Sequence, residues 1–107
     1  MSQFEDREKG FEAKFRRDKE REFKVTARRN KLLGLWAAEK MGLEEDDAEA
    51  YAREVVISDF AEPGDDDVVE RVLTDMHARG IDISKHVLRL ELTRLHEVAS
   101  EDLAGKD

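Results

Sequence analysis

The chain has 107 residues, which is enough to bury one hydrophobic core and too few for two. It contains no cysteine, so a disulfide framework, thiolate catalysis and a thiolate zinc site are excluded. Its longest uncharged apolar run, Leu32 to Ala38, has seven residues against the roughly 18 to 20 that span a bilayer, and the first twenty residues hold no apolar signal segment.

The charge is distributed unevenly along the chain. Residues 1–31 hold eleven Lys and Arg against seven Asp and Glu, a net charge of +4, whereas residues 32–107 carry a net charge of -12. Such asymmetry is typical of an interacting arm attached to a solvated body. An acidic body of this kind would repel nucleic acid, so DNA and RNA are not expected as partners.

Residues 1–22 contain no Leu, Ile or Val, and their large apolar residues are Phe4, Phe11 and Phe15. In a helix these three would lie within about 20° of one line on the surface, because successive residues turn by about 100°. Acids placed four residues before bases, as in Glu5 to Lys9 and Glu12 to Arg16, favour that helix.

Burial of three phenylalanines would contribute roughly 5 to 9 kcal/mol. Ordering some twenty residues costs about 1 kcal/mol or more for each. We therefore expect the first 18 residues to be a mobile arm that folds on a partner, with anchors spaced for recognition of a helix in a groove. The alternative is that the phenylalanines pack on the body as an ordinary helix extension, and periodicity alone does not separate the two.

The stretch "ARRNKLLGLWAAEKMG", residues 27–42, joins three cations to the apolar run. Leu32, Leu33, Leu35 and Trp36 would point to most sides of a helix, which predicts the central helix of a bundle with Trp36 filling the core. The small residues Gly34 and Ala38 would let another helix approach closely. We expect the cations Arg28, Arg29 and Lys31 at the exposed, arm-side end of this helix, and the joint between arm and body near residues 18–22.

Three breaks divide the rest of the chain: Gly42, the proline-containing segment 62–67, and Gly80. Asp46 and Asp47 are candidate caps for the second helix, and Ser84 is the candidate N-cap of the last one, with Ile83 and Leu88 spaced as a hydrophobic staple. We predict an all-α four-helix bundle. The apolar residues that recur at helical spacing are Tyr51, Val55, Val56 and Phe60; Val68, Val69, Val72, Leu73 and Met76; and Val87, Leu88, Leu92, Leu95, Ala99 and Leu103.

No pattern in the sequence predicts a metal, a cofactor or a catalytic site. His86 and His96 share a helix but are turned by about 80° from one another, so surface histidines are the simpler interpretation for them and for His77. The segment Asp65 to Met76 lacks the ligands of a calcium loop at several positions, and helix N-terminal charge explains its aspartates better. We do not expect an enzyme.

Three stretches carry a resemblance to a known family: "FEDREKGFEAKF" (residues 4–15), "ARRNKLLGLWAAEKMG" (residues 27–42) and "AYAREVVISDF" (residues 50–60). They are similar to the zeta subunit family of alphaproteobacteria, natural inhibitors of the F-type ATP synthase. The similarity covers nearly the whole chain, and its first sixty residues are the specific part.

The resemblance implies a four-helix bundle of residues 19–107 and an inhibitory arm of residues 1–18. It further implies that the arm becomes helical on entering a catalytic interface of the synthase's soluble head, where it blocks rotation in the direction of ATP hydrolysis. Carried over to this chain, the apolar anchors of the inhibitory contact are Phe4, Phe11 and Phe15. The polar flanks are Glu5, Arg7, Lys9, Glu12, Lys14, Arg16 and Arg17.

Two functional classes remain open at this stage. The first is a regulatory inhibitor of a rotary ATPase, located in the cytoplasm at the membrane-bound synthase, monomeric when free, and partnered by the catalytic head subunits. The second is a helical interaction or adaptor module in which the surface of the bundle is the working part. Only the first requires the arm.

Overall fold

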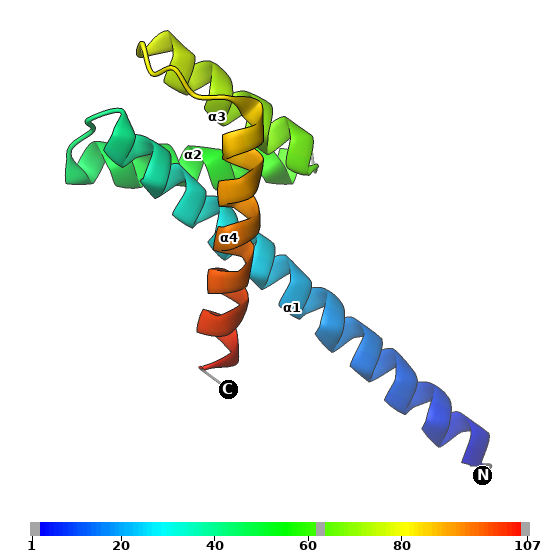
Figure 1. Ribbon diagram of the computed structural model, residues 1–107. Helices are drawn as coiled ribbons and strands as arrows, with labels where there is room; N and C mark the ends of the chain where they lie inside the picture. The colour runs from blue at the N-terminus through cyan, green and yellow to red at the C-terminus, as the bar shows by residue number, and fades with distance from the viewer. Residues whose placement is uncertain (1–2, 62–63, 106–107) are drawn as a thin grey trace.

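The computed structural model describes residues 3–61 and 64–105, with side chains for residue 14 and for residues 16–59 and 64–105. These residues form four helices and no strand, which confirms the all-α, four-helix prediction (Figure 1). Mobility of the arm in solution stays a prediction. The helices are α1 (Gln3–Lys40), α2 (Glu45–Ala61), α3 (Asp65–Ala78) and α4 (Lys85–Ala104).

The predicted glycine stops end two of the helices. Gly42 follows α1 with φ +75°, and the amides of Gly42 and Leu43 donate to the carbonyls of Glu39 and Ala38, both at 3.0 Å. This is a Schellman motif, whose left-handed residue favours glycine. Gly80 ends α3 in the same way, with φ +79° and amide bonds back to the last turn.

The helix starts agree with the sequence only in part. Ser84 caps α4 as predicted, since its hydroxyl accepts a hydrogen bond of 3.1 Å from the amide of Val87. The cap expected from Asp46 or Asp47 is wrong, because α2 begins at Glu45 and both aspartates lie inside its first turn. There their charges favour the helix through its dipole rather than through capping.

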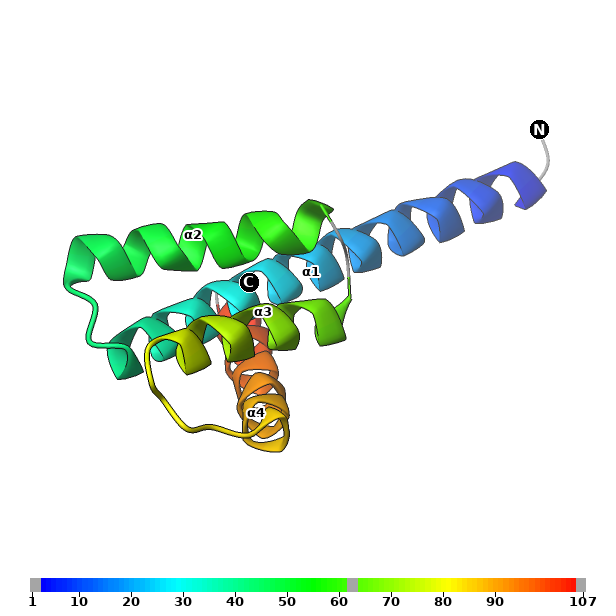
Figure 2. The same cartoon turned by 90° about the horizontal axis from the view of Figure 1, so that it is seen from above.

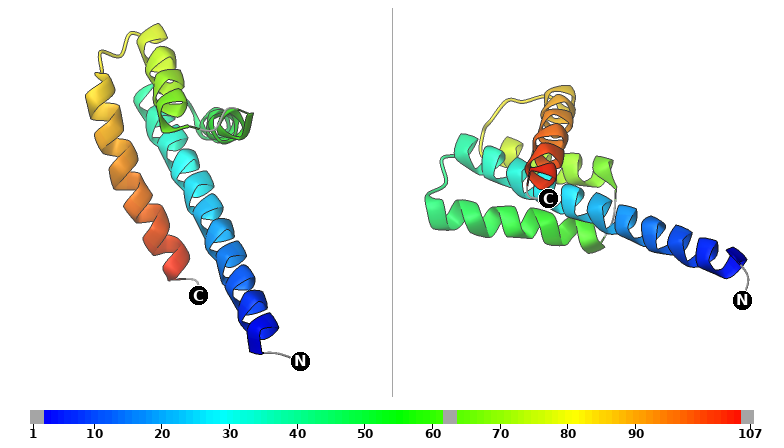
Figure 3. Two further views of the ribbon diagram at one scale, coloured as in Figure 1. Left: turned by 90° about the vertical axis from the view of Figure 1, so that its right-hand side faces the viewer. Right: turned by 90° about the horizontal axis from the view of Figure 1, so that it is seen from below.

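Helix α1 is the central element, since it contacts each of the other three helices. Helix α2 returns antiparallel along the C-terminal half of α1, and α3 lies on another side of that half (Figure 2). Helix α4 packs against α1 and crosses it at an angle (Figure 1 and Figure 3), and Asp102 near its C-terminal end bonds Arg28 of α1. The N-terminal part of α1 extends beyond all of them in each view.

The hydrophobic core is centred on Leu33 of α1, whose side chain is fully buried. Around it lie buried residues of the other helices: Val55, Val68, Val69, Val72, Met76, Leu88, Leu92 and Leu95. Ile83 is partly buried against the same cluster as Leu88, in keeping with the predicted staple.

Two residues assigned to the core by the sequence lie elsewhere. Trp36 is only partly buried at the margin of the core, with the Lys40 ammonium 5.0 Å from the centre of its ring. The neighbouring α1 residues Ala37 and Ala38 are fully buried instead. Val87 is 45 % exposed, since it is turned by about 100° from Leu88 on α4.

The molecule is elongated, measuring 65 × 25 × 22 Å, with a radius of gyration of 17.4 Å. A compact chain of this length would have a radius of gyration of about 13 Å. The difference reflects α1, whose 38 residues form a rod of about 57 Å at 1.5 Å per residue. The length of α1 beyond the core is the feature that bears on function.

Candidate functional site

The candidate site is the projecting segment of α1, defined here as residues 3–24. Its backbone is helical throughout and lies outside the four-helix core (Figures 1 and 3). All residues from Arg16 to Glu22, together with Phe23 and Lys24, are exposed, and Val25 is the first buried residue among the described side chains. A helix this exposed is held by its own hydrogen bonds rather than by packing.

Three of the ten predicted partner-binding residues have described side chains. Lys14, Arg16 and Arg17 are all exposed, as a surface for a partner requires. The other seven lie outside the described side chains, although their backbone belongs to α1. These seven are Phe4, Glu5, Arg7, Lys9, Phe11, Glu12 and Phe15.

Lys19 and Glu22 form an ion pair within the projecting segment. The ammonium of Lys19 lies 3.8 Å from a carboxylate oxygen of Glu22 one turn later, with the side chains 64 % and 73 % exposed. An exposed pair of this kind contributes well under about 1 kcal/mol. This pair therefore adds little to the stability of the projecting segment.

The predicted position of the cations at residues 28–31 is correct for one of the three. Lys31 is exposed, but Arg28 is half-buried and Arg29 is 4 % exposed. The assignment of Arg29 to the exposed end of the helix is therefore wrong, and that of Arg28 is met only in part. Val25, Arg29 and Leu33 are spaced by four residues, so Arg29 lies on the buried face of α1 between two core residues.

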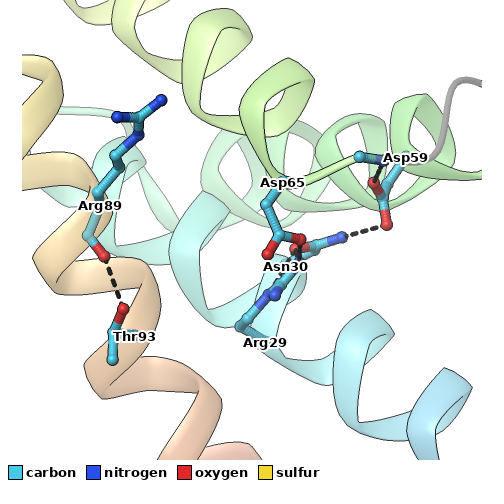
Figure 4. Close-up of polar contacts among 7 residues, drawn as sticks. Arg29, Asn30, Asp59, Asp65, Arg89 and Thr93 are labelled. Carbon is cyan, nitrogen blue, oxygen red and sulfur yellow. Dashed lines mark hydrogen bonds and ion pairs between the residues drawn. The ribbon is translucent and has the colours of Figure 1, made fainter.

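Arg29 and Asn30 form a buried polar network at the point where α1 leaves the core (Figure 4). Arg29 donates from Nε and Nη2 to Oδ1 of Asn30, at 3.1 and 3.0 Å, and from Nη2 to Oδ1 of Asp65 at 3.0 Å. Asn30 in turn donates from Nδ2 to Oδ2 of Asp59 at 2.8 Å. Among the described residues every buried side-chain nitrogen and oxygen has a partner.

A further ion pair lies on the other side of α1 at the same level. Nε of Arg28 donates to Oδ2 of Asp102 near the end of α4, at 2.9 Å, with both side chains 37 % exposed. Sequence reasoning assigned Arg28 and Arg29 to the surface and Asp65 to helix N-terminal charge. It gave no role to Asn30, Asp59 or Asp102. The four-residue spacing through Arg29 was the signal that could have found the network.

The alternative sites dismissed from the sequence have no support in the described part of the chain. The three histidines are exposed, and no group of three or more metal-binding side chains lies together among the described residues. Asp65, Asp66 and Asp67 form the first turn of α3, as helix N-terminal charge predicts. No helix among the described residues combines the length and the apolar character of a bilayer span.

The fold and the projecting segment together define a small helical protein that presents an exposed, charged helix outside its core. Comparison with known proteins gives a particular assignment. The profile of the family described as ATPase inhibitor subunit zeta matches residues 1–102, and the chain belongs to this family. It is a family of inhibitor subunits rather than of catalytic ones, in agreement with the sequence resemblance.

A solved structure supports the fold at useful identity. A protein studied by solution NMR is 42 % identical to this chain, superimposes with a TM-score of 0.68, and covers 79 % of this chain and 96 % of its own. A search of curated proteins finds no match. The family assignment therefore rests on the profile, and the fold has a separate relative.

Proposed function

We propose that this protein inhibits ATP hydrolysis by an F-type ATP synthase, with residues 1–18 as the inhibitory arm and residues 19–107 as the body. The arm enters a catalytic interface of the soluble head and obstructs the rotation that accompanies hydrolysis. The observation that carries the proposal is the extension of α1 as a helix beyond the core, with residues 16–24 exposed.

The dimensions of the arm suit an obstruction. Eighteen helical residues form a rod about 27 Å long and about 10 to 12 Å wide. A rod of this size can occupy an interface between subunits without requiring any reactive group. The body then remains outside the interface and works from the cytoplasmic side, reaching the membrane only through the synthase; when free, the protein is a monomer.

The proposed contacts follow the sequence pattern. Phe4, Phe11 and Phe15 are the apolar anchors, and buried aromatic residues usually dominate such interfaces. Lys14, Arg16 and Arg17 are exposed and can pair with acidic groups at the rim of the interface. The remaining polar flanks, Glu5, Arg7, Lys9 and Glu12, complete the polar set.

The test is inhibition of ATP hydrolysis by the cognate synthase head. Replacing Phe11 and Phe15 together, Phe11→Ala and Phe15→Ala, should raise the concentration for half-inhibition by at least about tenfold, which corresponds to only about 1.4 kcal/mol of binding. Deleting residues 1–18 should abolish inhibition. The free energy of unfolding of the double variant should match that of the parent, because both positions precede the packed body.

The matched control truncates two exposed apolar residues of the body. Val87 and Leu90 on α4 are 45 % and 57 % exposed, so Val87→Ala with Leu90→Ala removes exposed apolar surface from the bundle. Inhibition should be unchanged in this control. If this control inhibits less well while the phenylalanine variant inhibits like the parent, the surface of the bundle rather than the arm carries the inhibition. If the parent does not inhibit at all, the adaptor function replaces the inhibitor.

A further inference from the structure

Three consecutive residues of α1 form side-chain hydrogen bonds with the three other helices, one residue to each helix. Arg28 bonds Asp102 of α4, Arg29 bonds Asp65 of α3, and Asn30 bonds Asp59 of α2. Successive residues of a helix point about 100° apart, so three in a row face three different sides. We call these three residues and their three aspartate partners the polar collar.

The polar collar lies where α1 leaves the body. The exposed stretch of residues 16–24 ends four residues before Arg28, and the core residue Leu33 follows three residues after Asn30. Figure 4 shows Arg29 and Asn30 on α1 facing Asp65 and Asp59, which stand at the start of α3 and near the end of α2. The collar therefore surrounds the base of the projecting segment.

Stability alone does not explain these side chains. Arg29 and Asn30 are 4 % and 1 % exposed, and burying such groups costs desolvation that well-packed apolar residues of similar volume would avoid. Hydrogen bonds differ from apolar contacts in demanding particular distances and angles. A ring of three such contacts defines the rotation of α1 about its axis and its tilt against the other helices.

The part of α1 before the collar is long enough for a small change of its tilt to move the N-terminal end considerably. Residues 3–28 form a rod of about 38 Å, so a tilt of about 10° at the collar would displace the N-terminal end by about 6 to 7 Å, more than one helical turn. An arm that enters an interface while its body stays outside needs a defined angle between the two. Apolar packing at the base would leave that angle less well determined.

We propose that Arg28, Arg29 and Asn30 are positioning residues that fix the direction in which the arm leaves the body. The inference about inhibition rests on the proposed function, whereas the geometric part stands without it. When the arm is helical, as in α1, arm and body then meet the partner as one oriented unit. The collar residues need not touch the partner themselves.

The partners of the collar allow an informative variant. The Asp65 side chain is 69 % exposed and that of Asp102 is 37 % exposed, and Asp59 is intermediate, so losing the bond from α1 leaves no carboxylate sealed from water. The variant combines Arg28→Met, Arg29→Met and Asn30→Leu, which keep side-chain length and bulk. The control is Arg94→Met, which removes an ion pair with Glu91 within α4.

The measurement is the distribution of distances between two spin labels in the full-length protein. The chain has no cysteine, so introduced cysteines are labelled selectively. One label replaces the exposed Glu20 of the projecting segment, and the other replaces the exposed Asp47 of α2 or Glu97 of α4. A third sample carries labels at Asp47 and Glu97 and reports on the body alone.

In the triple variant, the distance distributions from Glu20 to Asp47 and from Glu20 to Glu97 should become at least twofold wider, or their mean distances should shift. The distribution from Asp47 to Glu97 and the midpoint of thermal unfolding should stay as in the parent and in Arg94→Met. Distributions from Glu20 as narrow as in the parent would overturn the proposal. If the triple variant does not fold, the half-exposed ion pair of Arg28 and Asp102 provides the test. Arg28→Asp should widen the distribution of distances between Glu20 and Glu97, and adding Asp102→Arg should restore its width. If Arg28→Asp leaves the width of this distribution unchanged, the proposal is overturned as well.

Inhibition separates this inference from the proposed function. If the parent inhibits the synthase head, the triple variant should need at least tenfold more protein for half-inhibition, although its arm sequence is unaltered, and Arg94→Met should not. Equal inhibition by the triple variant would contradict a role of the collar in inhibition. If the parent itself does not inhibit, the proposed function fails, and the label distances still decide whether the collar positions the arm.

Discussion

At the scale of single residues, Gly34 is the position where backbone geometry leaves least freedom. A Cβ atom built on Gly34 would lie 2.7 Å from Cα and 3.1 Å from Cβ of Ala52 on α2. The first of these distances is far inside van der Waals contact with backbone, so a side chain at Gly34 would push α1 and α2 apart. This is the close helix approach that the small residues of the sequence predicted.

We expect Gly34→Ala to lower the free energy of unfolding by about 1 to 3 kcal/mol, the usual cost of overpacking, despite the higher helix propensity of alanine. Denaturant titration measures the difference. Gly105→Ala is the control, because a Cβ there would meet only the carbonyl oxygens of Glu101 and Asp102, at 3.5 and 3.8 Å, which is ordinary contact. An unchanged stability of Gly34→Ala would mean that the two helices separate at little cost.

Tyr51 gives a pH-dependent prediction. Burial raises the pKa of its phenol well above the usual value, and the hydrogen bond that its hydroxyl donates to Oδ2 of Asp75, at 2.8 Å, raises the pKa further. The folded protein therefore retains the proton at pH values where the unfolded chain, with a pKa of about 10, releases it. The stabilisation by neutral Tyr51 is complete below about pH 10 and is lost as the pH rises through the folded pKa.

The variant Tyr51→Phe lacks this titration. The difference in unfolding free energy between the parent and Tyr51→Phe should shrink as the pH rises above about 10. Tyr51 is the only tyrosine of the chain, so tyrosinate absorbance reports its titration directly in the folded protein. Ionisation near the value of a free phenol would contradict burial as the cause.

At the scale of the elements, the helices and their ends were largely predictable because their signals are local. Gly42, Gly80 and Ser84 each act through bonds within a few residues, and the structure shows those bonds. The direction of α1 around residues 28–30 was not predictable in the same way. Its contacts join residues that are between 29 and 74 positions apart in the sequence. A charged residue such as Arg29 is therefore predicted to be exposed until its partners are known.

The candidate site follows the same division. The resemblance implied that Arg16 and Arg17 flank the contact; the structure shows both side chains exposed, and their role stays a prediction. The contacts of Phe4, Phe11 and Phe15 depend on a second protein. The surface of that protein cannot be derived from the sequence of this chain. Their role therefore remains a prediction for the inhibition assay.

The corrected core yields a prediction for α1. Leu33 is fully buried at the centre of the core, so Leu33→Ala should lower the free energy of unfolding by about 2 to 5 kcal/mol. Trp36→Ala should cost less than Leu33→Ala, although tryptophan is the larger residue, because Trp36 lies partly buried at the margin and can be replaced in part by water. Denaturant titration of both variants shows which of them loses more free energy of unfolding. A greater loss for Trp36→Ala would show that Trp36 belongs to the core after all.

At the scale of the whole molecule, shape and charge are arranged along the same axis. The projecting segment, residues 3–24, belongs to the basic part of the chain, and most of the described body of this elongated molecule belongs to the acidic part. Two regions of opposite charge at opposite ends orient a protein as it approaches a charged partner. The exposed pair Arg16 and Arg17 lies on the projecting side of this arrangement.

Reversing that pair tests whether the charge at the arm guides binding. Arg16→Glu with Arg17→Glu should slow association with the synthase head by about tenfold at low salt, with a smaller effect on dissociation, because exposed charges at a rim act mainly on encounter. Added salt should narrow the difference from the parent, since the Debye length falls from about 30 Å at 0.01 M to about 8 Å at 0.15 M. Stopped-flow measurement of association over a range of salt gives both quantities.

The matched control separates local charge from total charge. Lys31→Glu with Arg53→Glu changes the net charge by the same amount at two exposed positions of the body. If guidance comes from the arm, this control should associate nearly as fast as the parent, because its reversed charges lie away from the approaching end. Equal slowing by both pairs would show that the partner senses only the total charge, and the arm would then have no part in steering the encounter.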